Sequence, residues 1–367
     1  IEYDNLNDTQ ILVKIIELLD INNWTDLLII ILNKINLAFS LIIYEFKNNT
    51  MYILKDKFGL KPLCIGETSN GYCISSENNV LLNYHYIKEL DNNCIYRINT
   101  TERFIEIYNN KKVLDRRKLC LFEYIYFQNK QTKIYGGISK NIEYENKYDM
   151  NVYNKITIEN FRENLGKMLG KTEKIKKNKY NIFNNFNYNN IIVIGAPSTG
   201  IPYGIGFAKQ LNVSYKQFIN KVKNQKRSFI LNTHEKRIEQ IKKKFIIDNT
   251  ISIKNKIVYF VDDSLVRGNT INIIINLLKE YKPKEIHIRI GSPKILYPCY
   301  YGIDIPTKKE LIMNKYTEDE FNKKYKINSI RFLEVGKYNN IMTELNTDIS
   351  KFCTSCFTGK YLQEYDF

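Results

Sequence analysis

Residues Ile257 to Thr270 read IVYFVDDSLVRGNT and lead into the stretch INIIINLLKEY. The five β-prone apolar residues at 257–261 predict a short buried strand, and the apolar spacing after Thr270 predicts a helix. Asp262 and Asp263 stand where this strand ends, and Ser264 to Thr270 are expected to form a loop that supplies hydroxyls, one Arg and one Gly. The stretch therefore predicts a strand-loop-helix unit of a parallel α/β sheet.

The side chains of this unit indicate a kind of ligand. In open α/β sheets, ligands bind at the carboxyl ends of the strands, and the free N–H groups of a helix N-terminus accept a phosphate. Paired carboxylates repel phosphate, so Asp262 and Asp263 would hold sugar hydroxyls or a magnesium ion. We therefore predict a phosphorylated sugar. The stretch is neither a P-loop nor a dinucleotide fingerprint, and an ordinary βα connection with a polar turn remains the alternative.

Composition limits the class of protein. A chain of 367 residues that is 44% hydrophobic can bury two cores, so two domains are expected. The net charge of +16 accompanies a general excess of Asn, Lys, Ile and Tyr, and no nucleic-acid module accompanies it. No apolar run is long enough to predict a transmembrane helix. The chain starts at Ile1, which we interpret as the loss of an N-terminal segment. Seven cysteines fit a reducing, cytoplasmic location, although an organelle address stays open.

The rest of the chain divides into two regions. Residues 1 to about 115 alternate short strands with two helices, the first expected to be capped by Asp8 and Thr9, and predict an α+β piece. After Lys118, strands at 190–197, 257–261 and 285–290 alternate with helices, which predicts a parallel sheet with helices on both faces. Residues 140–155 and 175–190 are rich in Asn, Lys and Tyr and are expected to be loops or insertions.

VDDSLVRGNT resembles the phosphoribosyl-diphosphate fingerprint of type I phosphoribosyltransferases. Together with CLFEYIYF at 120–127, NLGKML at 164–169, RSFI at 227–230, YPCYYGID at 297–304 and CTSCFTGKY at 353–361, it resembles the glutamine phosphoribosylpyrophosphate amidotransferases. NDTQIL, AFSLII, KDKFGLKPL and SSEN extend the likeness to the N-terminal third. The resemblance implies the rear part of an α+β N-terminal-nucleophile glutaminase domain at 1–117 and a type I phosphoribosyltransferase domain at 118–367.

The resemblance also implies an activity and a substrate site. Ammonia released from glutamine would displace pyrophosphate from phosphoribosyl diphosphate and give 5-phosphoribosylamine, the first committed step of purine synthesis. Asp262, Asp263 and Thr199 would engage magnesium or the ribose hydroxyls. The 5-phosphate would be held by Ser264, Arg267, Gly268, Asn269 and Thr270, where Asn269 replaces the usual Thr. A mobile basic loop with Lys221, Arg227 and Lys244 would close over the diphosphate, although KVKNQK at 221–226 departs from the family pattern, and a solvated charged face is the alternative.

Four cysteines carry a second signal. Cys353 and Cys356 form a C-x-x-C pair, which by itself serves zinc, redox and structural roles alike. Cys120 and Cys299 fall where iron–sulfur members of the family place their other two ligands. The resemblance therefore implies a structural 4Fe–4S cluster on these four cysteines, and bare thiols or a zinc ion on the same ligands are the alternatives. His85, His234 and His287 show no metal-ligand spacing, so none is predicted to be catalytic.

The glutaminase half departs most from the family. Its nucleophile is an N-terminal cysteine, which this chain does not contain. Lys55 replaces the Arg that would clamp the glutamine α-carboxylate, and Glu89 is the candidate for holding the ammonium group. Two further hypotheses follow: a phosphoribosyltransferase that uses ammonia alone, and a regulator that binds phosphoribosyl diphosphate without turning it over. The family further implies a homotetramer inhibited by purine nucleotides.

Overall fold

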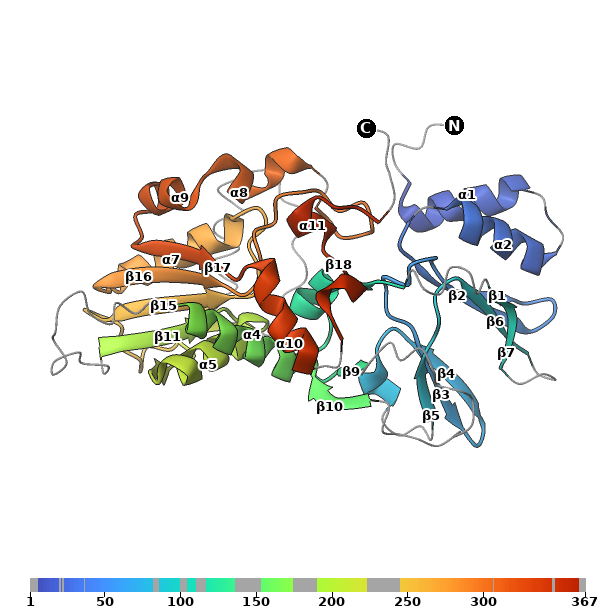
Figure 1. Cartoon of the computed structure of the whole chain (residues 1–367), viewed down its shortest axis with the longest axis horizontal. Coiled ribbons are helices and arrows are strands. Elements are labelled where there is room, and N and C mark those ends of the chain that lie inside the picture. The colour runs from blue at the N-terminus through green and yellow to red at the C-terminus, as the bar shows by residue number, and fades with distance from the viewer. Residues whose placement is uncertain are drawn as a thin grey trace. The chain divides into compact units, whose positions relative to one another are not determined.

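The chain folds as two units (Figure 1). The computed structural model describes residues 6–19, 21, 23–35, 37–81, 86–99, 104–109, 117–135, 153–173, 190–222, 245–305, 307–344 and 347–362. Unit 1 comprises residues 1–120, 144–150 and 300–302, and unit 2 comprises residues 121–143, 151–299 and 303–367. Within the described residues, every helix is too short or too polar to span a lipid bilayer.

The described part of unit 1 contains two α-helices and two antiparallel sheets. Its elements are α1 (Asp8–Leu19), α2 (Trp24–Lys34), β1 (Ser40–Glu45), β2 (Thr50–Lys55), β3 (Cys64–Thr68), β4 (Gly71–Ser75), the 3₁₀ turn η1 (Asn78–Leu81), β5 (Tyr86–Glu89), β6 (Cys94–Ile98), β7 (Ile105–Asn109) and β8 (Leu119–Cys120). The sheets have the orders β1-β2-β6-β7 and β4-β3-β5. This arrangement matches the predicted α+β piece.

The alternation of β2 explains how unit 1 is layered. Tyr52 and Leu54 lie in one cluster with the buried leucines of α2, whereas Ile53 lies in a second cluster with Ile65 of β3. Because successive side chains of a strand point to opposite faces, the β2 side chains separate into these two clusters. The four-stranded sheet therefore packs between the helices and the three-stranded sheet.

The prediction for the cap of α1 was wrong by one residue. The side chain of Asn7 accepts a hydrogen bond from the N–H of Gln10 (3.0 Å), and the Gln10 side chain accepts one from the N–H of Asn7 (2.9 Å). This reciprocal capping box makes Asn7 the first residue outside the helix, so Asp8 and Thr9 lie in the first turn. Asp8 still interacts favourably with the positive end of the helix.

Unit 2 is built on a parallel sheet. Its elements are the π-helix η2 (Glu123–Phe127), β9 (Lys133–Tyr135), β10 (Tyr153–Thr157), α4 (Ile158–Thr172), β11 (Ile191–Gly195), α5 (Gly200–Leu211), β12 (Ser214–Tyr215), β13 (Ile219–Lys221), β14 (Phe245–Ile247), β15 (Ile257–Asp262), α7 (Asn269–Glu280), β16 (Glu285–Ile290), η5 (Lys308–Glu310), α8 (Ile312–Lys315), α9 (Glu318–Tyr325), β17 (Ser329–Phe332), η6 (Val335–Lys337), α10 (Tyr338–Glu344), η7 (Ile349–Lys351), β18 (Phe352–Cys353) and α11 (Ser355–Thr358). Five parallel strands form the sheet in the order β12-β11-β15-β16-β17.

Both faces of this sheet are covered by helices, as predicted (Figure 1). Val258 and Phe260 of β15 lie in the large core with the apolar face of α7 and with Phe321 of α9. On the opposite face, the ring of Tyr259 lies 5.4 Å from that of Phe207 in α5. The central strand therefore points alternate side chains into two apolar layers, which agrees with its unbroken apolar run.

Two sequence expectations fail in detail. Helix α7 begins at Asn269 rather than after Thr270, because Gly268 turns the chain with φ 81° directly before it. The segment 140–155, expected to be a loop, ends in strand, because β10 starts at Tyr153 and pairs with β9. Residues 140–152 and 175–189 of the two expected insertions lie outside the described residues.

Helices α4 and α5 touch backbone to backbone. A Cβ atom on Gly206 would lie 1.9 Å from the carbonyl oxygen of Glu163, and one on Gly166 would lie 2.1 Å from that of Tyr203. No side chain fits at either position. The two glycines therefore set the distance between these helices, and α5 is the helix that starts beside the acid pair.

We predict that Gly206→Ala destabilises unit 2 by about 1–3 kcal/mol, because the added methyl group must push the two helices apart. Gly336→Ala is the control, since a Cβ on Gly336 would meet nothing within 4 Å. Urea unfolding of both variants measures the effect. Equal stabilities of the two variants would show that the α4–α5 contact is not tight.

Candidate functional site

The acid pair lies at the carboxyl end of the central strand. Asp262 is the last residue of β15, and Asp263 follows it and is 3% exposed. The carbonyl oxygens of both residues accept hydrogen bonds from the loop after β16, Asp262 from Gly291 N–H (2.9 Å) and Asp263 from Ser292 N–H (2.8 Å). The sheet ladder thus continues past the ends of its strands and fixes the backbone of both acids.

Hydroxyl groups hold the carboxylate of Asp263. Thr199 donates a short hydrogen bond to one oxygen, and Ser264 donates to the other at 2.6 Å. The carboxylate of Asp262 accepts a hydrogen bond from the backbone N–H of Asp263 (2.8 Å). The predicted residues Thr199, Asp262, Asp263 and Ser264 therefore do come together in one site.

Both carboxyl groups titrate abnormally. Burial, and then the neighbouring charge of Asp263, raise the pKa of Asp262 well above its ordinary value. Burial also raises the pKa of Asp263, although the hydrogen bonds from Ser264 and Thr199 oppose that shift. Two adjacent buried carboxylates disfavour each other's charge. Such a pair is a site that a cation would stabilise.

The turn after β11 brings Thr199 to the acids. Ser198 adopts φ 76°, and Gly200 begins α5 so close to the sheet that a Cβ would lie 2.9 Å from the carbonyl oxygen of Val261. Thr199 stands at the N-cap of α5, but its side chain makes no capping bond. Its hydroxyl points instead to Asp263.

The predicted phosphate loop is formed as a helix N-terminus. Gly268 occupies the N-cap of α7 in a left-handed conformation and has no side chain to cap the helix, so the N–H groups of Asn269 and Thr270 start the helix without a side-chain cap. A helix start of this kind favours an anion. The structure places Arg267 differently from the prediction, because its guanidinium binds Glu310 (2.7 Å) and Asp304 (3.3 Å). Arg267 therefore lies in an acidic neighbourhood rather than facing an open anion site.

The basic loop is only partly described. Lys221 is exposed and ends β13, which pairs antiparallel with β14. Arg227 and Lys244 lie outside the described residues.

The two predicted glutamine-binding residues in unit 1 bind each other. The ammonium of Lys55 lies 2.8 Å from the carboxylate of Glu89, and both side chains are buried, with 1% and 9% exposed. Arg117 adds a second cation 3.5 Å from the same Glu89 oxygen. The neighbouring Asp56 is also buried and accepts hydrogen bonds from the N–H groups of Phe58 and Gly59. These charges form an internal network.

The seven cysteines are thiols rather than disulfides. Cys353 and Cys356 are each 8% exposed, and the carbonyl of Cys356 accepts hydrogen bonds from Leu296 N–H (3.0 Å) and Tyr297 N–H (3.1 Å). The segment that carries Cys299 is thereby tied to the one that carries Cys356. Cys120 belongs to unit 1. Among the described residues, no group of three or more His, Cys, Asp or Glu side chains is arranged to hold a metal ion.

His287 is a residue of β16, as predicted. Its ring stacks on Tyr259 (4.8 Å between ring centroids), one nitrogen lies 2.8 Å from the hydroxyl of Ser329, and the other lies 2.9 Å from Glu285. Burial lowers its pKa. Both ring nitrogens therefore have partners inside the fold. His85 and His234 lie outside the described residues.

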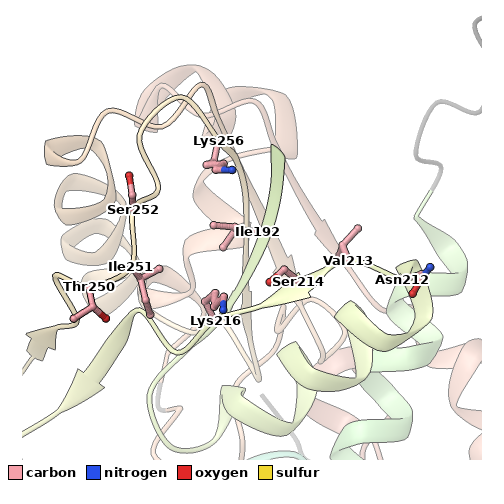
Figure 2. A pocket seen from close by; sticks show the side chains of 9 residues that line it. All are labelled: Ile192, Asn212, Val213, Ser214, Lys216, Thr250, Ile251, Ser252 and Lys256. Atoms are coloured by element: carbon pink, nitrogen blue, oxygen red, sulfur yellow. The ribbon is translucent and has the colours of Figure 1, made fainter. Parts of the chain in front are cut away.

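Unit 2 also has an open pocket of about 480 Å³ beside the edge strand β12 (Figure 2). It is lined by Ile192, Asn212, Val213, Ser214, Lys216, Thr250, Ile251, Ser252 and Lys256. None of the predicted site residues belongs to this lining. The acid pair, not this pocket, is the site that the sequence predicts.

Sequence reasoning missed the loop Gly291–Ser292–Pro293. It follows β16 as the acid pair follows β15, and it supplies the backbone donors for both acids. The rule that sites form at the carboxyl ends of adjacent parallel strands would have found it. It was overlooked because its side chains carry no charge.

Two family models match the chain, a glutamine amidotransferase domain at residues 6–134 and a phosphoribosyl transferase domain at residues 163–290. The amidophosphoribosyltransferase of Methanocaldococcus jannaschii is 30% identical over 350 residues, which cover 92% of this chain and 66% of that protein. That of Bacillus subtilis is 29% identical over 321 residues, covering 86% and 59%.

Solved structures agree with these relatives. The glutamine phosphoribosylpyrophosphate amidotransferase of B. subtilis, complexed with ADP and GMP, superimposes with a TM-score of 0.73 at 26% identity and covers 97% of this chain and 70% of that one. A structure described as the allosteric regulatory enzyme of purine biosynthesis gives a TM-score of 0.74 at 26% identity, covering 96% of this chain and 69% of that one.

The fold and site thus define a phosphoribosyltransferase domain joined to a glutamine amidotransferase domain. The chain belongs to the amidophosphoribosyltransferase family. It spans about three fifths to two thirds of the length of the two curated relatives it matches.

We predict that Asp262→Asn raises the melting temperature at neutral pH. The folded-state pKa of each acid is raised, so folding favours the protonated forms, and stability is greatest below the ordinary Asp pKa and falls as the pH rises toward the raised pKa. The variant loses part of this pH dependence. A gain of about 1 kcal/mol would appear as roughly 2–4 °C in calorimetry.

Asp248→Asn is the matched control for this experiment. Asp248 is a partly exposed acid of unit 2 whose pKa is lowered by hydrogen bonds from Thr250, so its replacement removes no repulsion. An Asp262→Asn variant that is less stable than wild type at neutral pH would contradict the argument.

Proposed function

We propose that the chain is an amidophosphoribosyltransferase, which makes 5-phosphoribosylamine from phosphoribosyl diphosphate and glutamine-derived ammonia in the first committed step of purine synthesis. The observation that carries the proposal is the adjacent pair of half-buried Asp262 and buried Asp263, which is followed within one loop by the N-terminus of α7, where no side chain caps the helix. The acids at the start of this loop suit a cation or the hydroxyl groups of a sugar, and the helix N-terminus at its end suits a phosphate. A phosphorylated sugar that carries a diphosphate with its metal ion has all of these groups.

The residues of the site fit a magnesium ion. The two carboxyl groups have raised pKa values because they are buried together, and a divalent cation would relieve that repulsion. Asp262 and Asp263 would hold the ion, directly or through water, with the hydroxyl of Thr199 beside them. When bound, magnesium neutralises charge that develops on the diphosphate.

The reaction is a displacement at C1 of the ribose. The nitrogen of ammonia forms a bond to C1, the bond from C1 to pyrophosphate breaks with its electron pair on pyrophosphate, and the new amine loses a proton. Positive charge develops on the sugar, and the carboxylates Asp262 and Asp263 stabilise it from fixed positions. The N–H groups at the start of α7 hold the 5-phosphate and orient C1.

A second candidate is a phosphoribosyltransferase that uses free ammonia. The observation in its favour is the buried pair of Lys55 and Glu89, which satisfy each other's charge and so are not arranged to receive glutamine. The match of the glutamine amidotransferase model at residues 6–134 favours the first candidate. A regulator that only binds phosphoribosyl diphosphate is the third.

Pyrophosphate release separates the three candidates. With phosphoribosyl diphosphate and magnesium, we expect release with ammonium, and release with glutamine once the N-terminal cysteine of the family precedes this chain. Release with ammonium alone from a protein that carries that cysteine would favour the ammonia-dependent enzyme, and no release with ammonium would favour the regulator. Asp263→Asn should lower the rate with ammonium by about 10²–10³-fold, because a fixed charge is removed from the reacting centre. Asp248→Asn, which lies outside the site, should keep the wild-type rate.

We further propose a 4Fe–4S cluster on Cys120, Cys299, Cys353 and Cys356. Four thiols are the usual donors of such a cluster, and the segments that carry Cys299 and Cys356 are hydrogen-bonded to each other. Anaerobic purification followed by iron and acid-labile sulfide assays is expected to give about four of each per chain. Cys356→Ser should lose them, whereas Cys73→Ser in unit 1 should not. A colourless wild-type protein that carries zinc would overturn the cluster.

We also propose that the protein is cytoplasmic, is a homotetramer and is inhibited by purine nucleotides. The odd number of cysteines, seven, supports a reducing compartment. The related B. subtilis structure is a complex with ADP and GMP, which supports nucleotide inhibition. The tetramer rests on the family resemblance.

A further inference from the structure

The peptide group between Gly291 and Ser292 is held at both ends. Its N–H donates to the carbonyl oxygen of Asp263 (2.8 Å), and its carbonyl oxygen accepts a hydrogen bond from the hydroxyl of Tyr338 (2.7 Å). The preceding peptide is held in the same way, because Gly291 N–H donates to Asp262 and the carbonyl of Ile290 accepts from Leu333 N–H. Two successive peptides thus hydrogen-bond to the backbone carbonyls of Asp262 and Asp263 and fix their positions.

Of these two peptides, the one between Gly291 and Ser292 is held by a side chain. Strand β16 ends at Ile290 and β17 at Phe332, so the carbonyl of Gly291 lies beyond the reach of the sheet ladder. The hydroxyl of Tyr338, at the start of α10, takes the place of a strand neighbour. Tyr338 is 0% exposed, so without it this carbonyl would be left in a dry interior.

Tyr203 closes the other side of the loop. A Cβ on Gly291 would lie 2.2 Å from the ring of Tyr203, so the loop packs directly against that ring. The hydroxyl of Tyr203 points elsewhere and donates to the carbonyl of Ile125 (3.1 Å). Two fully buried tyrosines therefore contact the same loop, but only one of them hydrogen-bonds to it.

We propose that Tyr338 is a positioning residue for the acid pair, acting through the Gly291–Ser292 peptide. This inference rests on the proposed function. A carbonyl that accepts a hydrogen bond polarises its peptide and strengthens the bond that the N–H of the same peptide donates. The bond to Asp263 fixes the backbone from which its carboxylate meets Thr199 and Ser264. Loss of the Tyr338 hydroxyl frees that backbone without touching the ligand.

Tyr338→Phe and Tyr203→Phe form a matched pair. Each removes one hydroxyl from a fully buried tyrosine that donates to a backbone carbonyl, so both should lower the melting temperature by similar amounts. We expect only Tyr338→Phe to weaken binding of phosphoribosyl diphosphate in saturating magnesium, by about tenfold. Isothermal titration calorimetry of the full chain measures this. Equal weakening in both variants would show a general loss of packing and overturn the proposal.

Amide hydrogen exchange at Ser292 gives a second readout. Its N–H is the group that holds Asp263, so exchange should accelerate in Tyr338→Phe and stay at the wild-type rate in Tyr203→Phe. If Tyr338→Phe does not fold, the wild type still decides: magnesium and phosphoribosyl diphosphate should slow exchange at Ser292. An unchanged rate would contradict a role of this peptide in positioning the acids.

The proposed function and the positioning role of Tyr338 are refuted by different results. A wild-type protein that does not bind phosphoribosyl diphosphate with magnesium would refute the proposed function. A wild type that binds it, with Tyr338→Phe binding equally well, would leave that function intact and refute the positioning role of Tyr338.

Discussion

The rest of unit 2 is arranged around two adjacent carboxylates at the end of a buried strand. Asp262 and Asp263 continue an apolar run, so burial raises the pKa of both. The surrounding groups offset the free-energy cost of burying these charges only in part. Peptide N–H groups hydrogen-bond to the backbone carbonyls of both acids, and the hydroxyls of Thr199 and Ser264 donate to the carboxylate of Asp263. Hydroxyl groups orient a carboxylate but do not neutralise its charge. A bound cation would therefore lower the electrostatic free energy of this site.

The buried acid Glu89 of unit 1 is in the opposite situation to Asp262 and Asp263. Glu89 meets the ammonium of Lys55 and the guanidinium of Arg117, so its charge is compensated inside the protein. Removing either partner from such a pair leaves an uncompensated charge, which is why buried pairs resist change. Unit 2 contains a compensated pair of the same kind, Glu173 with Arg289, whose side chains are 4% and 1% exposed. The carboxylates of Asp262 and Asp263 differ from these, because hydroxyl and peptide N–H groups, rather than cations, hydrogen-bond to them.

The sequence predicted the elements well where periodicity is strong. β16 was predicted with its observed bounds, and β11 and β15 were predicted to within two residues, because apolar patterns specify both type and place. Caps and turns were predicted less well. Asn7 rather than Asp8 caps α1, since several residues in that stretch can accept the same hydrogen bond. The start of α7 depended on the positive φ of Gly268, which a sequence does not display.

The sequence predicted which residues belong to the candidate site, but not which hydrogen-bond and ion-pair partners they have. The family resemblance predicted that Thr199, Asp262, Asp263 and Ser264 share one site, and each of them stands at a strand end or a helix start. The partners of Arg267, and the mutual bond of Lys55 and Glu89, depend on residues far away in the chain. Tyr338 was missed for the same reason, since its hydroxyl reaches a carbonyl 47 positions earlier.

Strand geometry separates the roles of the two acids. Val258 and Phe260 of β15 face α7, whereas Tyr259 faces α5, so the alternation assigns Asp262 to the α7 side and Asp263 to the α5 side. The bond from Thr199, at the start of α5, to Asp263 agrees with this assignment. Asp263 is therefore held by protein hydroxyls, while Asp262 lies on the side where helix α7 begins. The acid that the protein leaves less occupied is the one best placed to meet a ligand.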